Sequence, residues 1–149
     1  MKRLLIVTAV IELGVGLALL CFPSATVTLL LGSGLDTPAS VALGHVAGTA
    51  LFALGVACWL AHYDAQSCAA RGLVSAMVLY NLGATIILGV AGIQLRPIGV
   101  GLWPAVVLHA VMTIWCVTCL LRKPTRINRH NKSKSKGTRI MKPIRLIAI

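Results

Sequence analysis

Charged residues, and acidic ones above all, are scarce in this chain of 149 residues. Only 11% of the residues are charged and three are acidic, whereas about a quarter of a typical soluble domain is charged. Because 58% of the residues are hydrophobic, the chain has too few polar side chains to cover a surface exposed to water. This composition excludes a soluble globular domain, and we expect lipid to surround most of the chain.

Motifs of catalysis are also lacking. The chain contains no nucleotide-binding, phosphate-binding or hydrolase motif, so an enzyme is the least supported class and we expect no cofactor. The cysteines are not spaced like a secreted disulfide framework, so we expect no structural disulfide. They are Cys21, Cys58, Cys68, Cys116 and Cys119.

The net charge of +11 comes almost entirely from the C-terminal tail, residues 122–149. Residues 1–121 contain four basic and three acidic residues, whereas the tail contains ten basic residues and no acidic one. We expect the tail to be disordered and to contact anionic lipid, with about 1 kcal/mol gained per basic residue near the membrane surface. It lacks interleaved aromatic residues, so we expect no nucleic-acid partner.

Four apolar stretches are long enough to cross a bilayer, which takes about 20 residues. They are residues 4–22, 41–61, 72–92 and 98–121. Short loops join them, so we expect consecutive spans to be antiparallel neighbours. The sequence thus predicts an all-α fold, a four-helix antiparallel transmembrane bundle over residues 1–121.

Pro23 interrupts the first apolar stretch. Helices usually end before a proline, so we expect the crossing to stop near Phe22 and a short outer helix to cover residues 24–31. The alternative is one kinked, tilted helix. The basic start and apolar run also resemble a signal peptide, but Glu12 lies inside the run and argues against cleavage.

The distribution of basic residues predicts the orientation of the spans. With the N-terminus inside, Lys2, Arg3, Arg71 and the whole tail are cytoplasmic, and only Arg96 lies outside. The opposite orientation requires the basic tail to be translocated. We therefore predict that the N-terminus and the C-terminus are both cytoplasmic.

Small residues predict how the helices pack, because membrane helices associate through close contact rather than through a hydrophobic driving force. In the second span, Gly44, Gly48 and Gly55 fall on one face together with Leu51, Cys58 and His62. Gly44 and Gly48 form a GxxxG pair. We predict that these glycines are helix-packing residues. In the first span, Thr8, Ala9, Glu12 and Gly16 share a face in the same way.

Glu12, Asn81 and His109 are the polar residues that most need an explanation. Helical rise places them about 12, 13 and 18 Å from the cytoplasmic ends of their spans, so the three side chains could meet near the middle of the membrane. One interpretation is a proton-relay or ligand site. The other is a buried hydrogen-bonded cluster that fixes helix register.

The thiols form a weaker pattern. Cys116 and Cys119 share a helix face, as do Cys58 and His62, and such a set suits Cu(I) or Zn²⁺. The alternative is that they are apolar packing residues, because a buried cysteine usually behaves as a small hydrophobic residue. We expect no bound metal.

Several short runs carry a resemblance to known proteins. They are Glu12-Leu13-Gly14-Val15-Gly16, Pro23, Gly44-His45-Val46-Ala47-Gly48, Ala57-Cys58-Trp59-Leu60 and Tyr80-Asn81. In these runs the chain resembles small uncharacterised four-span proteins of the bacterial inner membrane, and more broadly the DoxX-like four-helix membrane proteins. The resemblance covers residues 1–121, not the tail. It implies an inner-membrane location and no established activity.

Small multidrug-resistance transporters provide a second comparison. They also have four spans and an essential Glu early in the first, and Ala9-Val10-Ile11-Glu12 is similar to that region in placement. The other spans do not match, and the charge bias of this chain is stronger. This likeness is an analogy and identifies no family.

Three functional hypotheses follow. The first is a small structural or accessory membrane protein with a membrane partner or a second copy of itself. The second is a proton-coupled transporter of a small solute that uses Glu12. The third is a membrane protein that handles metal or redox chemistry through its thiols.

Overall fold

The computed structural model describes residues 1–94 and 98–122, and these residues are helical apart from short connections. Four helices are long and apolar enough to cross a membrane. They are α1 (Lys2–Cys21), α3 (Pro38–Ala61), α4 (Cys68–Gln94) and α5 (Leu102–Leu121). The shortest have 20 residues, which at 1.5 Å per residue is about 30 Å, the thickness of the hydrocarbon core.

The prediction of an all-α chain with four membrane-spanning helices is thus confirmed. The chain is a small multi-pass membrane protein. Large apolar side chains such as Leu43, Leu79, Ile93 and Ile114 are exposed on these helices, as a membrane-spanning helix requires of its lipid-facing side.

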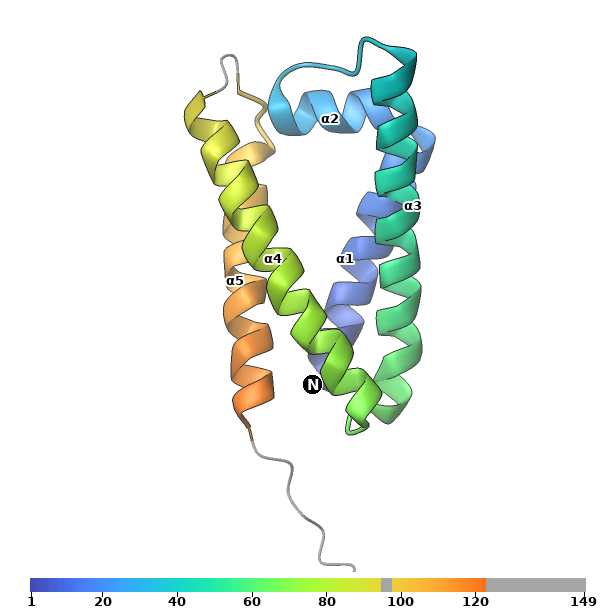
Figure 1. Ribbon diagram of the computed structural model, residues 1–149, viewed down its shortest axis with the longest axis vertical. Coiled ribbons are helices and arrows are strands. Elements are labelled where there is room, and N and C mark those ends of the chain that lie inside the picture. The colour runs from blue at the N-terminus through green and yellow to red at the C-terminus, as the bar shows by residue number, and fades with distance from the viewer. Residues whose placement is uncertain (95–97, 123–149) are drawn as a thin grey trace, which may run out of the picture.

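A short helix, α2 (Pro23–Leu31), follows α1 directly. The backbone breaks at Phe22, and Pro23 begins the new helix, where its missing N–H removes no hydrogen bond. Figure 1 shows α2 lying crosswise over one end of the molecule, beyond the long helices. Gly32 ends α2 in the left-handed conformation at φ 83°. The chain therefore has a short separate helix after the first span and not one long kinked helix.

Two helices begin at other residues than predicted, because local hydrogen bonds determine where each helix starts. Helix α3 begins at Pro38 rather than residue 41 because Thr37 and Ser40 form a capping box. Helix α5 begins at Leu102 rather than residue 98, because the backbone before it is used to contact α2. There the N–H of Gly101 donates to the carbonyl oxygen of Leu29 at 2.9 Å.

The four spans are arranged as two pairs rather than as one evenly packed bundle. Helix α1 packs mainly on α3, and α4 packs mainly on α5, whereas the contact between α3 and α4 is small although they are consecutive. Arg71 also links the second pair, because its guanidinium donates to the carbonyl oxygen of Leu120 at 3.2 Å. The expectation that all consecutive spans are close neighbours is therefore wrong for the second and third spans.

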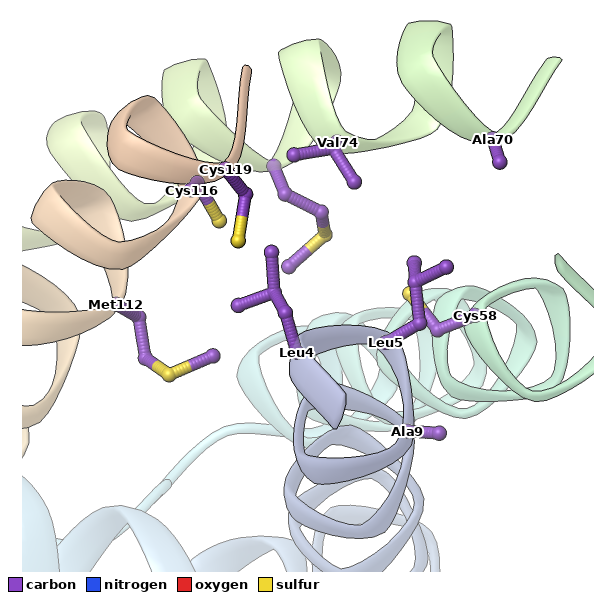
Figure 2. Packing of buried hydrophobic residues seen from close by; sticks show 10 residues of the cluster. Leu4, Leu5, Ala9, Cys58, Ala70, Val74, Met112, Cys116 and Cys119 are labelled. Carbon is purple, nitrogen blue, oxygen red and sulfur yellow. The ribbon is translucent and has the colours of Figure 1, made fainter. Parts of the chain in front are cut away.

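The two pairs meet at the end of the molecule where the chain begins. The core there contains residues of all four spans. Figure 2 shows Leu5 of α1 beside Cys58 of α3, and Leu4 pointing toward Cys116 and Cys119 of α5. At the other end α2 crosses between the pairs and contacts the start of α5.

The N-terminus, the α3–α4 connection and the end of α5 all lie at this core end (Figure 1). The connection contains a short 3-10 helix, η1 (His62–Asp64). Two predictions concern residues outside the described part of the chain. They are the external position of Arg96 and the disorder of the tail over residues 123–149.

Candidate functional site

Glycines allow the backbones of α1 and α3 to touch. A Cβ atom on Gly48 would lie 2.9 Å from the Cβ of Leu19 and 3.0 Å from the carbonyl oxygen of Gly16. One on Gly55 would lie 2.8 Å from the backbone nitrogen of Leu13. Only glycine fits such contacts, which join the first helix pair along its length.

Gly44 lies further along the same face of α3, at the end where α2 begins. A Cβ atom there would lie 2.9 Å from the side chain of Leu35 and 3.0 Å from that of Pro23. Gly44 is therefore buried against the α2 region rather than against the backbone of α1.

Gly16 is the matching position on α1, and it is the most crowded of these glycines. A Cβ atom there would lie 2.6 Å from the backbone nitrogen of Phe52. The sequence placed Gly16 on the inner face but did not mark it as a contact residue. The only feature of the sequence that indicates this contact is the position of Gly16, four residues after Glu12 on the same face of the helix.

The predicted polar residues come together in one small cavity between the pairs. Thr8 and Glu12 of α1, Asn81 of α4 and His109 of α5 supply its polar lining, and Ile11, Leu108 and Met112 supply its apolar lining. The cavity volume is about 10 Å³. A cavity needs roughly 10–15 Å³ to hold one water molecule, so this one has room for about one water and not for an organic solute.

Asn81 and His109 form a hydrogen bond that joins α4 to α5. The side-chain Nδ2 of Asn81 donates to the carbonyl oxygen of Met77 at 2.8 Å. Its Oδ1 lies 2.9 Å from Nδ1 of His109. Since an amide oxygen only accepts, Nδ1 of His109 must carry the proton of this bond, and Nε2 is left as the other ring nitrogen. Tyr80 packs edge-on against the same imidazole, at a centroid distance of 5.7 Å.

Glu12 lies in the cavity without a hydrogen bond. Its side chain is 4% exposed, yet within residues 1–94 and 98–122 no hydrogen bond or ion pair reaches its carboxyl group. Thr8, one turn earlier on α1, is also a buried residue, and its hydroxyl group has no hydrogen bond to a described residue. The structure therefore brings the three predicted residues to one cavity but directly bonds only two of them.

The candidate metal ligands do not form one site. Cys58, Cys116 and Cys119 are buried, but Leu4 and Leu5 of α1 occupy the space between α3 and α5 (Figure 2). His62, the first residue of η1, bonds through Nδ1 to the carbonyl oxygen of Trp59 in the last turn of α3. Among the described residues, no group of three or more His, Cys, Asp or Glu side chains converges to hold a metal ion. All five cysteines are free thiols.

Comparison with known proteins adds no family to these observations. No protein-family model matches the chain, and no curated protein or solved structure matches it.

Proposed function

We propose that this chain is a small structural or accessory protein of the bacterial inner membrane, without enzymatic activity of its own. It acts by holding two helix pairs in the bilayer, together with a membrane partner or a second copy of itself. The observation that carries the proposal is the small size of the polar cavity, which has room for about one water molecule.

The cavity argues against a solute path within a single chain. A transporter must admit its solute to the group that couples transport to protons, which here is Glu12. The space beside Glu12 measures about 10 Å³, and the side chain is 4% exposed. The buried groups instead serve packing, since Asn81 and His109 tie α4 to α5 and the glycines tie α1 to α3.

The charge distribution supports the orientation that we propose. The described basic residues Lys2, Arg3, Arg71 and Arg122 lie at the end of the molecule where the chain begins. The positive-inside rule assigns that end to the cytoplasm. The basic tail then starts on the cytoplasmic side, beside anionic lipid of the inner leaflet.

A proton-flux assay tests the proposal. The protein is reconstituted in vesicles that contain a pH-sensitive dye, and a potassium diffusion potential drives protons inward. We expect vesicles with wild-type protein, with Glu12→Gln and without protein to acidify at the same rate. Faster acidification by the wild type that disappears in a stably folded Glu12→Gln variant would favour a transporter instead.

A proton-coupled transporter remains the second candidate, and one observation favours it. Ionisable groups inside a membrane usually have a partner, yet the carboxyl group of Glu12 has no hydrogen-bond partner in the described residues. A transporter would need a second conformation or a second copy to open a path to this group. No comparable observation favours the third hypothesis, in which the thiols handle metal or redox chemistry.

A further inference from the structure

The polar cavity contains three groups with unused hydrogen-bonding capacity, and they come from both helix pairs. Glu12 and Thr8 on α1 have no hydrogen bond to a described residue. His109 on α5 uses Nδ1 to bond Asn81, which leaves Nε2. The cavity volume of about 10 Å³ is close to the space that one water molecule needs. Buried waters typically make about three hydrogen bonds, and this cavity offers three partners.

We propose that this cavity binds one water molecule, through which Glu12 and His109 share a single proton. The water accepts the proton of the Glu12 carboxyl group and gives one of its own protons to Nε2 of His109. The carboxylic acid becomes a carboxylate, the neutral imidazole becomes an imidazolium, and the water is unchanged. No proton enters or leaves the cavity in this exchange.

Asn81 is the positioning residue of this site. Its Nδ2 is held by the carbonyl oxygen of Met77, so its Oδ1 must face His109. This bond keeps the proton of the neutral imidazole on Nδ1. The basic lone pair is therefore on Nε2, and in the proposed site this nitrogen accepts the hydrogen bond of the water.

The other titratable side chains near Glu12 do not compete for this proton at neutral pH. Cys58 of α3 and Tyr80 of α4 lie within range of the charge on Glu12. An ordinary thiol releases its proton near pH 8.5 and an ordinary phenol near pH 10. Both groups therefore stay neutral while Glu12 and His109 exchange their proton.

The site links the two helix pairs in the middle of the membrane. Glu12 and Thr8 belong to the α1–α3 pair, whereas His109 and Asn81 belong to the α4–α5 pair. Elsewhere the pairs meet through the apolar core at one end and through α2 at the other. The water supplies the polar connection between these two contacts.

Nuclear magnetic resonance of the full-length protein in lipid vesicles tests the proposal, with histidine labelled by ¹⁵N. We expect magnetisation to pass from water to the ring of His109. We also expect Glu12→Gln to move the midpoint of the His109 titration by about one pH unit or more, because coupled groups titrate as a pair. The signal of His45, which is exposed on α3, should be unaffected by Glu12→Gln and serves as the internal control.

A reciprocal variant keeps the test decisive if Glu12→Gln does not fold. In His109→Gln, labelled with ¹³C at glutamate, the titration midpoint of the Glu12 carboxyl carbon should move by a similar amount. An unchanged His109 midpoint in folded Glu12→Gln, or an unchanged Glu12 midpoint in folded His109→Gln, would overturn the shared proton. A His109 ring that receives no magnetisation from water would overturn the bound water.

Discussion

At the scale of single residues, the bond between Asn81 and His109 should be measurable as a coupling energy. Replacing one partner by Ala leaves the other with an unpaired buried group. Interhelical hydrogen bonds in membranes are worth about 0.6 kcal/mol on average and up to about 1.7 kcal/mol in double-mutant cycles. We predict a coupling free energy in that range for the Asn81→Ala and His109→Ala cycle, measured by unfolding in detergent.

The matched control for this cycle pairs Asn81→Ala with His45→Ala. His45 is exposed on α3, which packs mainly on α1, whereas Asn81 lies on α4, so these two effects should add. If the effects of Asn81→Ala and His109→Ala also add, as in the control pair, the bond contributes nothing to stability.

At the scale of helices, the contact between α1 and α3 should tolerate no added methyl group. Gly16→Ala places a Cβ atom 2.6 Å from the backbone nitrogen of Phe52, so the helices must separate. We predict a loss of about 1–3 kcal/mol, as for other overpacked sites. Gly14→Ala on the same helix is the control, because no atom lies within 4 Å of its Cβ position. Equal melting temperatures for the two variants would contradict the close contact.

The docking of α2 on the start of α5 should depend on Gly99. A Cβ atom on this residue would lie 2.4 Å from the carbonyl oxygen of Leu29 and 2.5 Å from the carbonyl carbon of Leu30. Gly99→Ala should push α2 away and break the bond from the N–H of Gly101 to Leu29. We predict faster hydrogen exchange at the Gly101 amide. Gly89→Ala, whose Cβ position is open, should leave that exchange rate unchanged.

At the scale of the whole molecule, the orientation in the membrane is open to direct measurement. Reporter fusions after Asp36 and Arg96 should report an external position, and fusions after Asp64 and Arg122 a cytoplasmic one. The reason is the gathering of basic residues at one end of the molecule. A cytoplasmic signal from the Asp36 fusion would overturn the arrangement of four spans.

The sequence predicts the number of helices well because length and apolar composition decide which segments cross a bilayer. Pro23 likewise marks the break between α1 and α2, since a proline is accepted at the start of a helix. The pairing of the helices is harder to predict. In lipid, the outer apolar faces of a helix do not favour one neighbouring helix over another. Which helices pair therefore depends on close contacts such as that of Gly16 with Phe52.

For the candidate site too, the sequence predicts one part and only the structure gives the rest. Helical rise alone brings Glu12, Asn81 and His109 to similar depths, and the structure places all three in one cavity. Which of them bond each other depends on rotation of the helices and on side-chain rotamers, which the spacing of residues does not determine. The bond from Asn81 to Met77 and the place of Thr8 in the cavity lining therefore appear only in the structure.

Carbodiimide labelling of Glu12 tests the closed cavity most directly, because the proposed structural role depends on it. Dicyclohexylcarbodiimide dissolves in lipid and reacts with carboxylic acids that it can reach inside a membrane. In folded protein in vesicles, we predict that mass spectrometry finds no adduct at Glu12, since the side chain is 4% exposed. The unfolded chain, labelled under the same conditions, should form the adduct and serves as the control. Rapid labelling of Glu12 in the folded protein would contradict the closed cavity and favour a transport path.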